Sequence, residues 1–114
     1  MKKILLVMSV ALCFASCTTQ KPLYTWDKYN TTSYNYLKNG DEKSVQQLIE
    51  TYQKIIEKQK GSRGVVPPGI YADYGFILLQ ADMTKEAKEM FQREIALYPE
   101  SKVFIDRILK MFEK

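Results

Sequence analysis

The chain has 114 residues, of which 46% are hydrophobic and 26% are charged, with 17 Lys and Arg against 13 Asp and Glu. This length and composition describe one small domain with a single core, and they exclude a collagen-like, low-complexity or multi-domain chain. The sequence has no His and only two Cys. Because His is the commonest general base and the commonest metal ligand, we expect no enzyme, no metal site and no cofactor.

The beginning of the chain has the pattern of a bacterial export signal. Two lysines precede an apolar stretch over residues 4–14. This stretch has the length of a signal-peptide core and is shorter than the roughly 20 apolar residues that span a membrane. Ala15 and Ser16 lead to Cys17, and this run resembles the lipobox, in which the cysteine is acylated and becomes the first residue after cleavage. Phe14 stands where most lipoboxes have Leu. The alternative is an ordinary secretory leader with an ordinary thiol.

Acylation at Cys17 divides the chain into three parts. We expect a signal peptide over residues 1–16, a lipidated tether over 17–25 and a helical domain over 26–114. Two or more acyl chains, palmitate among them, hold a protein stably on a bilayer. By resemblance to the lipoprotein sorting rules of Gram-negative bacteria, Thr18 after the cysteine implies the outer membrane, and we expect the periplasmic face.

The charge that remains after cleavage is small. Removal of Lys2 and Lys3 lowers the formal net charge from +4 to +2. A nucleic-acid-binding domain would carry a clustered basic stripe, so we expect no nucleic acid as a partner.

Turn-forming residues divide the rest of the chain into pieces of helical length. Apolar residues within these pieces recur at three- and four-residue intervals. Helices are predicted after the N-cap candidate Asp41 as far as Lys60, after Thr84, and after Ser101, another N-cap candidate. The apolar stripe of the last helix is expected to comprise Phe104, Ile108, Leu109 and Phe112. No stretch alternates with period two for long, so the predicted fold is all-α.

Residues 71–99 resemble one tetratricopeptide repeat. The matching residues are Tyr71, Tyr74, Gly75, Leu78, Ala87, Phe91 and Pro99, spaced as in the signature of about 34 residues. In such a repeat the glycine lets the facing helix approach closely, the phenylalanine fills the gap and the proline ends the second helix. The sequence departs from the pattern at Glu94, where a small residue is usual, and at Tyr74, where Leu is commoner.

A second, degenerate repeat is expected to precede this one, from Trp26 to Lys60, and residues 101–114 are expected to form a capping helix. The predicted architecture is therefore two tetratricopeptide-like helical hairpins and a C-terminal helix. With the strings at residues 67–75 and 98–101, the chain resembles a family of small uncharacterised bacterial lipoproteins. Their genes often lie beside a lipoprotein similar to the curli secretion channel. This resemblance implies an envelope assembly and no activity.

The repeat geometry predicts a concave, partner-binding face on the first helix of the good repeat. Its residues are Ala72, Phe76, Leu79 and Gln80. The alternative is that these side chains belong to the core, covered by the helix after Asp41 or by the segment at Trp26.

Two further groups of side chains have more than one interpretation. The aromatic cluster fits an interfacial belt, a partner-binding patch or part of the core; its members are Tyr24, Trp26, Tyr29, Tyr34 and Tyr36. A basic run fits either a surface that faces anionic lipid or a solvated helix face; its members are Lys54, Lys58, Lys60 and Arg63.

We therefore expect a lipid-anchored adaptor that binds another envelope lipoprotein or a secretion-channel-like protein. One alternative is a purely structural subunit, bound through the edges of the domain and not through the groove. Another is a small-ligand-binding periplasmic protein, which would need a polar pocket.

Overall fold

The computed structural model describes residues 2–3 and 20–113. Over residues 20–113 the chain forms helices joined by turns, and none of the described residues lies in a strand. The elements are α2 (Tyr29–Asn39), α3 (Glu42–Glu57), α4 (Ile70–Gln80), α5 (Thr84–Leu97), the short 3-10 helix η1 (Pro99–Ser101) and α6 (Lys102–Phe112). The prediction of an all-α fold is confirmed. The apolar stretch of the predicted signal peptide and Cys17 lie outside the described residues.

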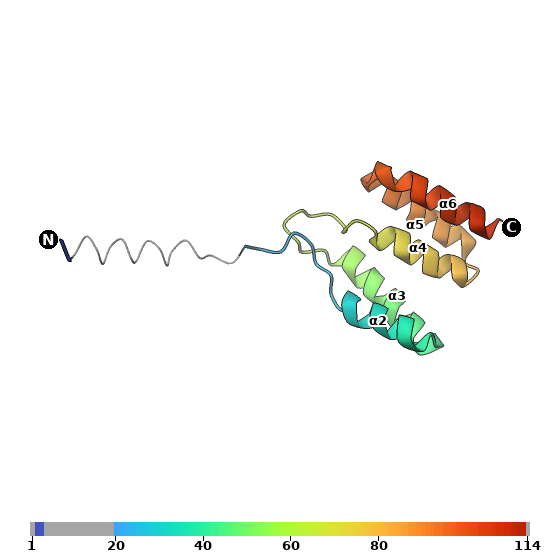
Figure 1. Ribbon diagram of the computed structural model, residues 1–114, viewed down its shortest axis with the longest axis horizontal. Coiled ribbons are helices and arrows are strands. Elements are labelled where there is room, and N and C mark those ends of the chain that lie inside the picture. The colour runs from blue at the N-terminus through green and yellow to red at the C-terminus, as the bar shows by residue number, and fades with distance from the viewer. Residues whose placement is uncertain (1, 4–19, 114) are drawn as a thin grey trace.

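The helices follow one another across the molecule. In Figure 1, α2 and α3 form one hairpin, α4 and α5 form the next, and α6 lies over the second hairpin. The predicted arrangement of two helical hairpins and a C-terminal helix is therefore confirmed. As a result α2 and α6 are the two outermost layers of the stack.

The turn between α2 and α3 is specified by two adjacent residues. Gly40 has a left-handed backbone, with φ of 60°, and its N–H donates to the Tyr36 carbonyl at 2.9 Å. Glycine adopts this conformation without steric cost, so it ends α2. Asp41 is the N-cap of α3, as predicted, and its carboxylate accepts a hydrogen bond from the Ser44 N–H at 3.0 Å.

The second hairpin depends on a close approach between α4 and α5. A Cβ atom placed on Gly75 would lie 2.7 Å from Cε1 of Phe91 and 3.1 Å from the Ala87 carbonyl oxygen. Ala87 and Phe91 are both buried. A side chain at residue 75 would therefore force the two helices apart or displace the Phe91 ring.

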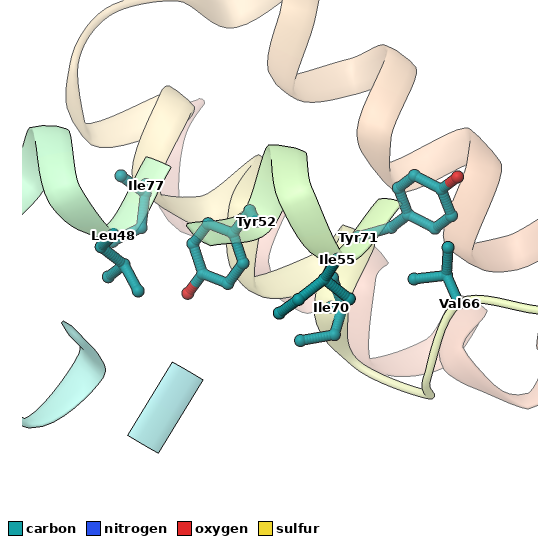
Figure 2. Close-up of a cluster of buried hydrophobic side chains, with 7 residues drawn as sticks. All are labelled: Leu48, Tyr52, Ile55, Val66, Ile70, Tyr71 and Ile77. Atoms are coloured by element: carbon teal, nitrogen blue, oxygen red, sulfur yellow. The ribbon is translucent and has the colours of Figure 1, made fainter. Parts of the chain in front are cut away.

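Two groups of buried apolar side chains form the core. The first joins α3 to α4 and is shown in Figure 2; it comprises Leu48, Tyr52, Ile55, Val66, Ile70, Tyr71 and Ile77. The second joins α4, α5 and α6; it comprises Ala72, Leu78, Leu79, Ala87, Phe91, Ile105 and Ile108. Helix α4 contributes to both groups, which is why it is apolar on most of its circumference.

Helix α6 differs from the prediction at two points. Ile105 is fully buried whereas Phe104 and Phe112, both predicted in the stripe, are exposed, so the buried stripe runs through residues 105 and 108. Ser101 does not cap the helix through its side chain. Its own backbone is already helical, with φ of −71° and ψ of −13°, because η1 runs directly into α6.

The segment before α2 is docked onto the loop between α3 and α4. The N–H groups of Ser62 and Arg63 donate to the carbonyl oxygens of Pro22 and Leu23 at 2.9 and 3.2 Å. Thr25 exchanges hydrogen bonds with the Gln59 side chain. Residues 22–25 of the predicted tether therefore pack against the helical domain.

Candidate interaction surface

The four residues predicted to form a concave binding face lie in different environments. Ala72 and Leu79 are buried in the second core group, where α6 contributes Ile105 and Ile108. Phe76 is half-buried, and its ring meets the Phe112 ring edge-on at 6.0 Å. Helix α6 thus covers this side of α4, in place of the helix after Asp41 or the segment at Trp26 that the core alternative predicted.

Gln80, the fourth of these residues, is exposed at the C-terminal end of α4, where it meets the first hairpin. Its Oε1 accepts a hydrogen bond from the Tyr36 hydroxyl at 2.9 Å. A hollow of about 470 Å³ opens here between the two hairpins; it is lined by Tyr36, Gly40, Glu42, Val45, Ile77, Gln80 and Ala81. Its lining offers one carboxylate and no pair of groups suited to proton transfer.

The residues that resemble the repeat signature mostly form the interior of the second hairpin. Tyr71, Gly75, Leu78, Ala87 and Phe91 are buried. Tyr74 is half-buried and stacks on Tyr52, with the ring centroids 5.4 Å apart, and Pro99 begins η1. Their arrangement therefore concerns packing between helices and not contact with a ligand.

Glu94 has a structural role that the sequence analysis missed. Its side chain is buried, with 1% of its surface exposed. Oε1 accepts a hydrogen bond from the Gly69 N–H at 2.8 Å and lies 3.5 Å from the Ser101 hydroxyl oxygen. Gly69 is the N-cap of α4 and has no side chain to cap the helix. Glu94 therefore supplies, from α5, the carboxylate that favours a helix N-terminus.

A row of aromatic rings leads from the N-terminal segment into the first core group. Successive ring centroids along Tyr24, Trp26, Tyr29, Tyr52 and Tyr74 are 6.2, 5.7, 6.1 and 5.4 Å apart. The predicted aromatic cluster is therefore divided: its Tyr29 and Tyr36 pack against the core, whereas Trp26 and Tyr34 are exposed.

One carboxylate lies beside this row. The Tyr29 hydroxyl donates to Oδ2 of Asp73 at 2.8 Å. Burial raises the pKa of Asp73 above its ordinary value, and the hydrogen bond from Tyr29 lowers it in part. Burial and the same carboxylate raise the pKa of Tyr29 to about 12. The pair is a hydrogen bond between α2 and α4 and not a proton-transfer site at neutral pH.

The outward side of α6 is an apolar helix surface that no other described element covers. We call it the α6 outer face and define it by Val103, Phe104, Arg107, Lys110 and Met111. The three apolar members expose 63%, 56% and 69% of their surface. Residues three, four and seven apart lie on one side of a helix, so these side chains adjoin one another.

The α6 outer face is also basic. Asp106, beside it, forms an ion pair with Lys102 at 2.6 Å. Arg107 and Lys110 are both exposed, and neither has a salt bridge within residues 20–113. The face can therefore contact an apolar surface and attract an acidic one at the same time.

Among the residues that the structure describes, no three His, Cys, Asp or Glu side chains gather as metal ligands. None of the described helices combines the length and the apolar character needed to cross a bilayer.

A family model for a domain of unknown function, DUF4810, matches residues 23–108. The chain belongs to the DUF4810 family. This fits the expected membership of an uncharacterised family. The DUF4810 match begins at Leu23, where the N-terminal segment docks, and ends within α6. Searches of curated proteins and of solved structures gave no significant match.

Proposed function

We propose that this DUF4810 protein is a lipid-anchored adaptor, which binds another protein of the bacterial envelope through the α6 outer face. The observation that carries the proposal is the apolar character of that face. In stacked helical repeats a terminal helix that ends the structure has a polar outer side. Here α6, the last helix that the structure describes, exposes Val103, Phe104 and Met111, so its surface resembles an inner layer.

The sequence supplies the argument for the anchor. The run from Phe14 to Cys17 resembles a lipobox and follows an apolar stretch of signal-peptide length. Thr18 after the cysteine implies the outer membrane, and we propose the periplasmic face. Two or more acyl chains on Cys17 would hold the domain there stably.

The chemistry of the α6 outer face restricts its partner. We propose an amphipathic helix that lays an apolar stripe against Phe104 and Met111 and offers acidic side chains to Arg107 and Lys110. Such a helix would form the next layer of the stack. Two tetratricopeptide-like hairpins are fewer than the three or so repeats usually needed for stability, which favours completion by a partner.

The resemblance to small lipoproteins encoded beside a curli-secretion-channel-like lipoprotein makes such a channel the first partner to examine. We propose no catalytic role. Neither the sequence nor the described hollows supply a nucleophile with its base or a set of metal ligands.

A second candidate, a structural subunit held at both ends of the stack, is favoured by one observation. Helix α2, the other outermost layer, exposes Tyr34 and Leu37, three residues apart on one side of the helix. In that case both outer layers would be interfaces. A small-ligand-binding protein is less well supported, because the hollows are open to solvent and would leave much of a small ligand exposed.

The test is crosslinking in intact cells, followed by purification of the DUF4810 protein and identification of its partners. We expect Phe104→Glu with Met111→Glu to abolish recovery of the partner and to leave helicity unchanged. Leu37→Glu makes the same chemical change on α2 and is the matched control.

The three outcomes separate the candidates. Loss of the partner only with the α6 changes supports the adaptor. Loss with the α6 changes and also with Leu37→Glu supports the structural subunit. Full recovery of the same partner from both variants would contradict both proposals.

A further inference from the structure

The basic side chains of the domain gather at the end that carries the N-terminal segment. We call this the tether end and define it by residues 20–28, 57–69 and 97–101. Hydrogen bonds join these three segments: the Ser62 N–H to the Pro22 carbonyl, and the Tyr98 hydroxyl to the Val66 carbonyl at 2.7 Å. In Figure 1 these three segments lie at the left-hand ends of the helices, on the side where the N-terminal segment joins the domain.

The two ends of the domain have opposite charge. The tether end has five basic and three acidic side chains, a net charge of +2. Among the described residues, the opposite end comprises 38–43, 80–86 and 112–113 and has three basic and five acidic side chains, a net charge of −2. The domain is therefore electrically polar along its helices.

The positive charge at the tether end surrounds a shallow hollow. This hollow has a volume of about 330 Å³ and is lined by Thr25, Asp27, Lys54, Lys58 and Lys60. Arg63 lies on the same loop and is exposed. None of these cations has a salt bridge within the described part of the chain. The three lysines of the hollow outnumber its one carboxylate, Asp27, so the hollow can accommodate an anionic group against ammonium groups.

Exposed apolar side chains lie among these cations. Leu23, Trp26, Val65 and Leu97 are all exposed at the tether end. Tryptophan is enriched where proteins meet the headgroup region of a bilayer, because its ring has an apolar body and a polar N–H. Basic residues mixed with such side chains are typical of surfaces that lie on anionic membranes.

The proposed anchor would hold this end, and not the opposite one, against the membrane. Five peptide steps separate Cys17 from Pro22, and an extended chain spans at most about 3.6 Å per residue, or about 18 Å in total. Pro22 and Leu23 are held on the loop at Ser62 and Arg63. Acylation at Cys17 would therefore place the basic hollow within reach of the headgroups.

We propose that the tether end is a binding face for anionic phospholipid. Lys58, Lys60 and Arg63 contact headgroup phosphates, and Leu23 and Trp26 enter the interfacial layer. The face orients the domain so that the acidic end points away from the membrane. This inference rests on the proposed lipid anchor for its position on the membrane but not for its binding chemistry.

Trp26 is the single tryptophan of the chain and reports directly on this contact. The acylated protein is reconstituted into vesicles of phosphatidylcholine, with or without about one third phosphatidylglycerol, that contain brominated lipid as a quencher. We expect strong quenching of Trp26 fluorescence only with phosphatidylglycerol. The combination Lys58→Glu, Lys60→Glu and Arg63→Glu should reduce quenching to the level in phosphatidylcholine alone.

The opposite end supplies the matched control. The combination Lys38→Glu, Lys43→Glu and Lys85→Glu makes the same charge change there and should leave quenching unaltered. Equal loss with both combinations would overturn the assignment to the tether end. Unquenched Trp26 in phosphatidylglycerol vesicles would overturn the proposal outright.

A second measurement separates this proposal from the proposed anchor. Residues 17–114 with Cys17→Ser, which carry no acyl chain, are sedimented with the same vesicles. We expect binding that requires phosphatidylglycerol and is at least tenfold weaker after charge reversal at the tether end. Displacement by inorganic phosphate at constant ionic strength would show a general anion site and contradict the lipid assignment. Acylation itself is read from the mass of the natural protein, so either proposal can fail alone.

Discussion

Glu94 shows how one buried side chain can hold three segments together. Its carboxylate contacts the backbone before α4 and lies near Ser101 at the start of α6, while Glu94 itself belongs to α5. Its second oxygen is buried and has no hydrogen-bond partner among the described residues. The favourable position at a helix N-terminus offsets the cost of burying this group.

We expect Glu94→Ala to lower the free energy of unfolding by about 2–4 kcal/mol. The change leaves the Gly69 N–H without its acceptor and opens a cavity. For a domain of this size about 1 kcal/mol corresponds to a Tm shift of about 4–8 °C. Thermal unfolding followed by circular dichroism measures the loss. Glu94→Gln, which retains an acceptor, is the control and should lose less; an unchanged Tm for Glu94→Ala would refute the role.

Asp73 makes stability depend on pH in a direction opposite to that of most carboxylates. Burial raises the pKa of Asp73, so the folded protein binds this proton more tightly than the unfolded chain does. The contribution of Asp73 to stability is therefore greatest at low pH, and it falls as the pH rises from the unfolded-state pKa through the folded-state pKa. Asn keeps an acceptor for the Tyr29 hydroxyl without the charge.

We predict that Asp73→Asn stabilises the domain at neutral pH. The gain should shrink as the pH is lowered, because protonation then removes the same charge from the natural protein. Urea unfolding between about pH 3 and pH 7 provides the comparison. A gain that stays constant over this range would show that the charge of Asp73 is not its cause.

At the scale of helices, the close approach of α4 to α5 depends on the absence of a side chain at Gly75. Gly75→Ala should destabilise the domain by about 1–3 kcal/mol, although alanine favours helix, because the new Cβ would lie 2.7 Å from the Phe91 ring. Phe91→Leu shortens the opposing side chain. Denaturant unfolding of both single variants and the double variant should show a loss smaller than the sum of the two; full additivity would contradict the close contact.

The docking of the N-terminal segment depends on a second glycine. A Cβ on Gly61 would overlap the Leu23 carbonyl and Cα of Tyr24. Gly61→Ala should therefore displace residues 22–25 and expose Trp26 further to water. We expect a red shift of its fluorescence and faster proteolysis before α2, with Ser62→Ala as a control that keeps the backbone contacts. An emission spectrum identical to that of the natural protein would show that the segment does not need this approach.

The helices could be predicted from the sequence because their information is local. Apolar residues at three- and four-residue intervals and the cap at Asp41 specify α3 whatever surrounds it. Which helix packs against which cannot be predicted in this way, because it depends on contacts between residues far apart in the sequence. The covering of Ala72 and Leu79 by α6, and the contact between Glu94 and Gly69, join segments that spacing alone does not relate.

The buried side of α6 could not be predicted from the sequence, because this helix has apolar residues on two sides. Phe104 and Ile108 satisfy helical spacing as well as Ile105 and Ile108 do, so the pattern cannot decide which stripe is buried. The structure buries Ile105 and leaves Phe104 exposed. The candidate interaction surface follows from that difference, and it could not be recognised before the inner side was known.

In the whole molecule, the proposed membrane-binding tether end and the proposed protein-binding α6 outer face lie at different positions along α6. Its first residues lie beside the tether end, whereas Met111 is nine residues further, or about 14 Å along the helix axis. A contact at Met111 therefore reports on a protein partner and not on lipid. Phe104 lies closer to the proposed membrane face and distinguishes the two less well.

The most direct test of the adaptor is a photo-crosslinking amino acid at Met111, activated in intact cells that produce the full chain. The same amino acid at Gln92, which is exposed on α5, is the control. The proposal predicts one discrete protein adduct from residue 111 and none from residue 92. No adduct from residue 111, or the same adducts from both positions, would contradict it.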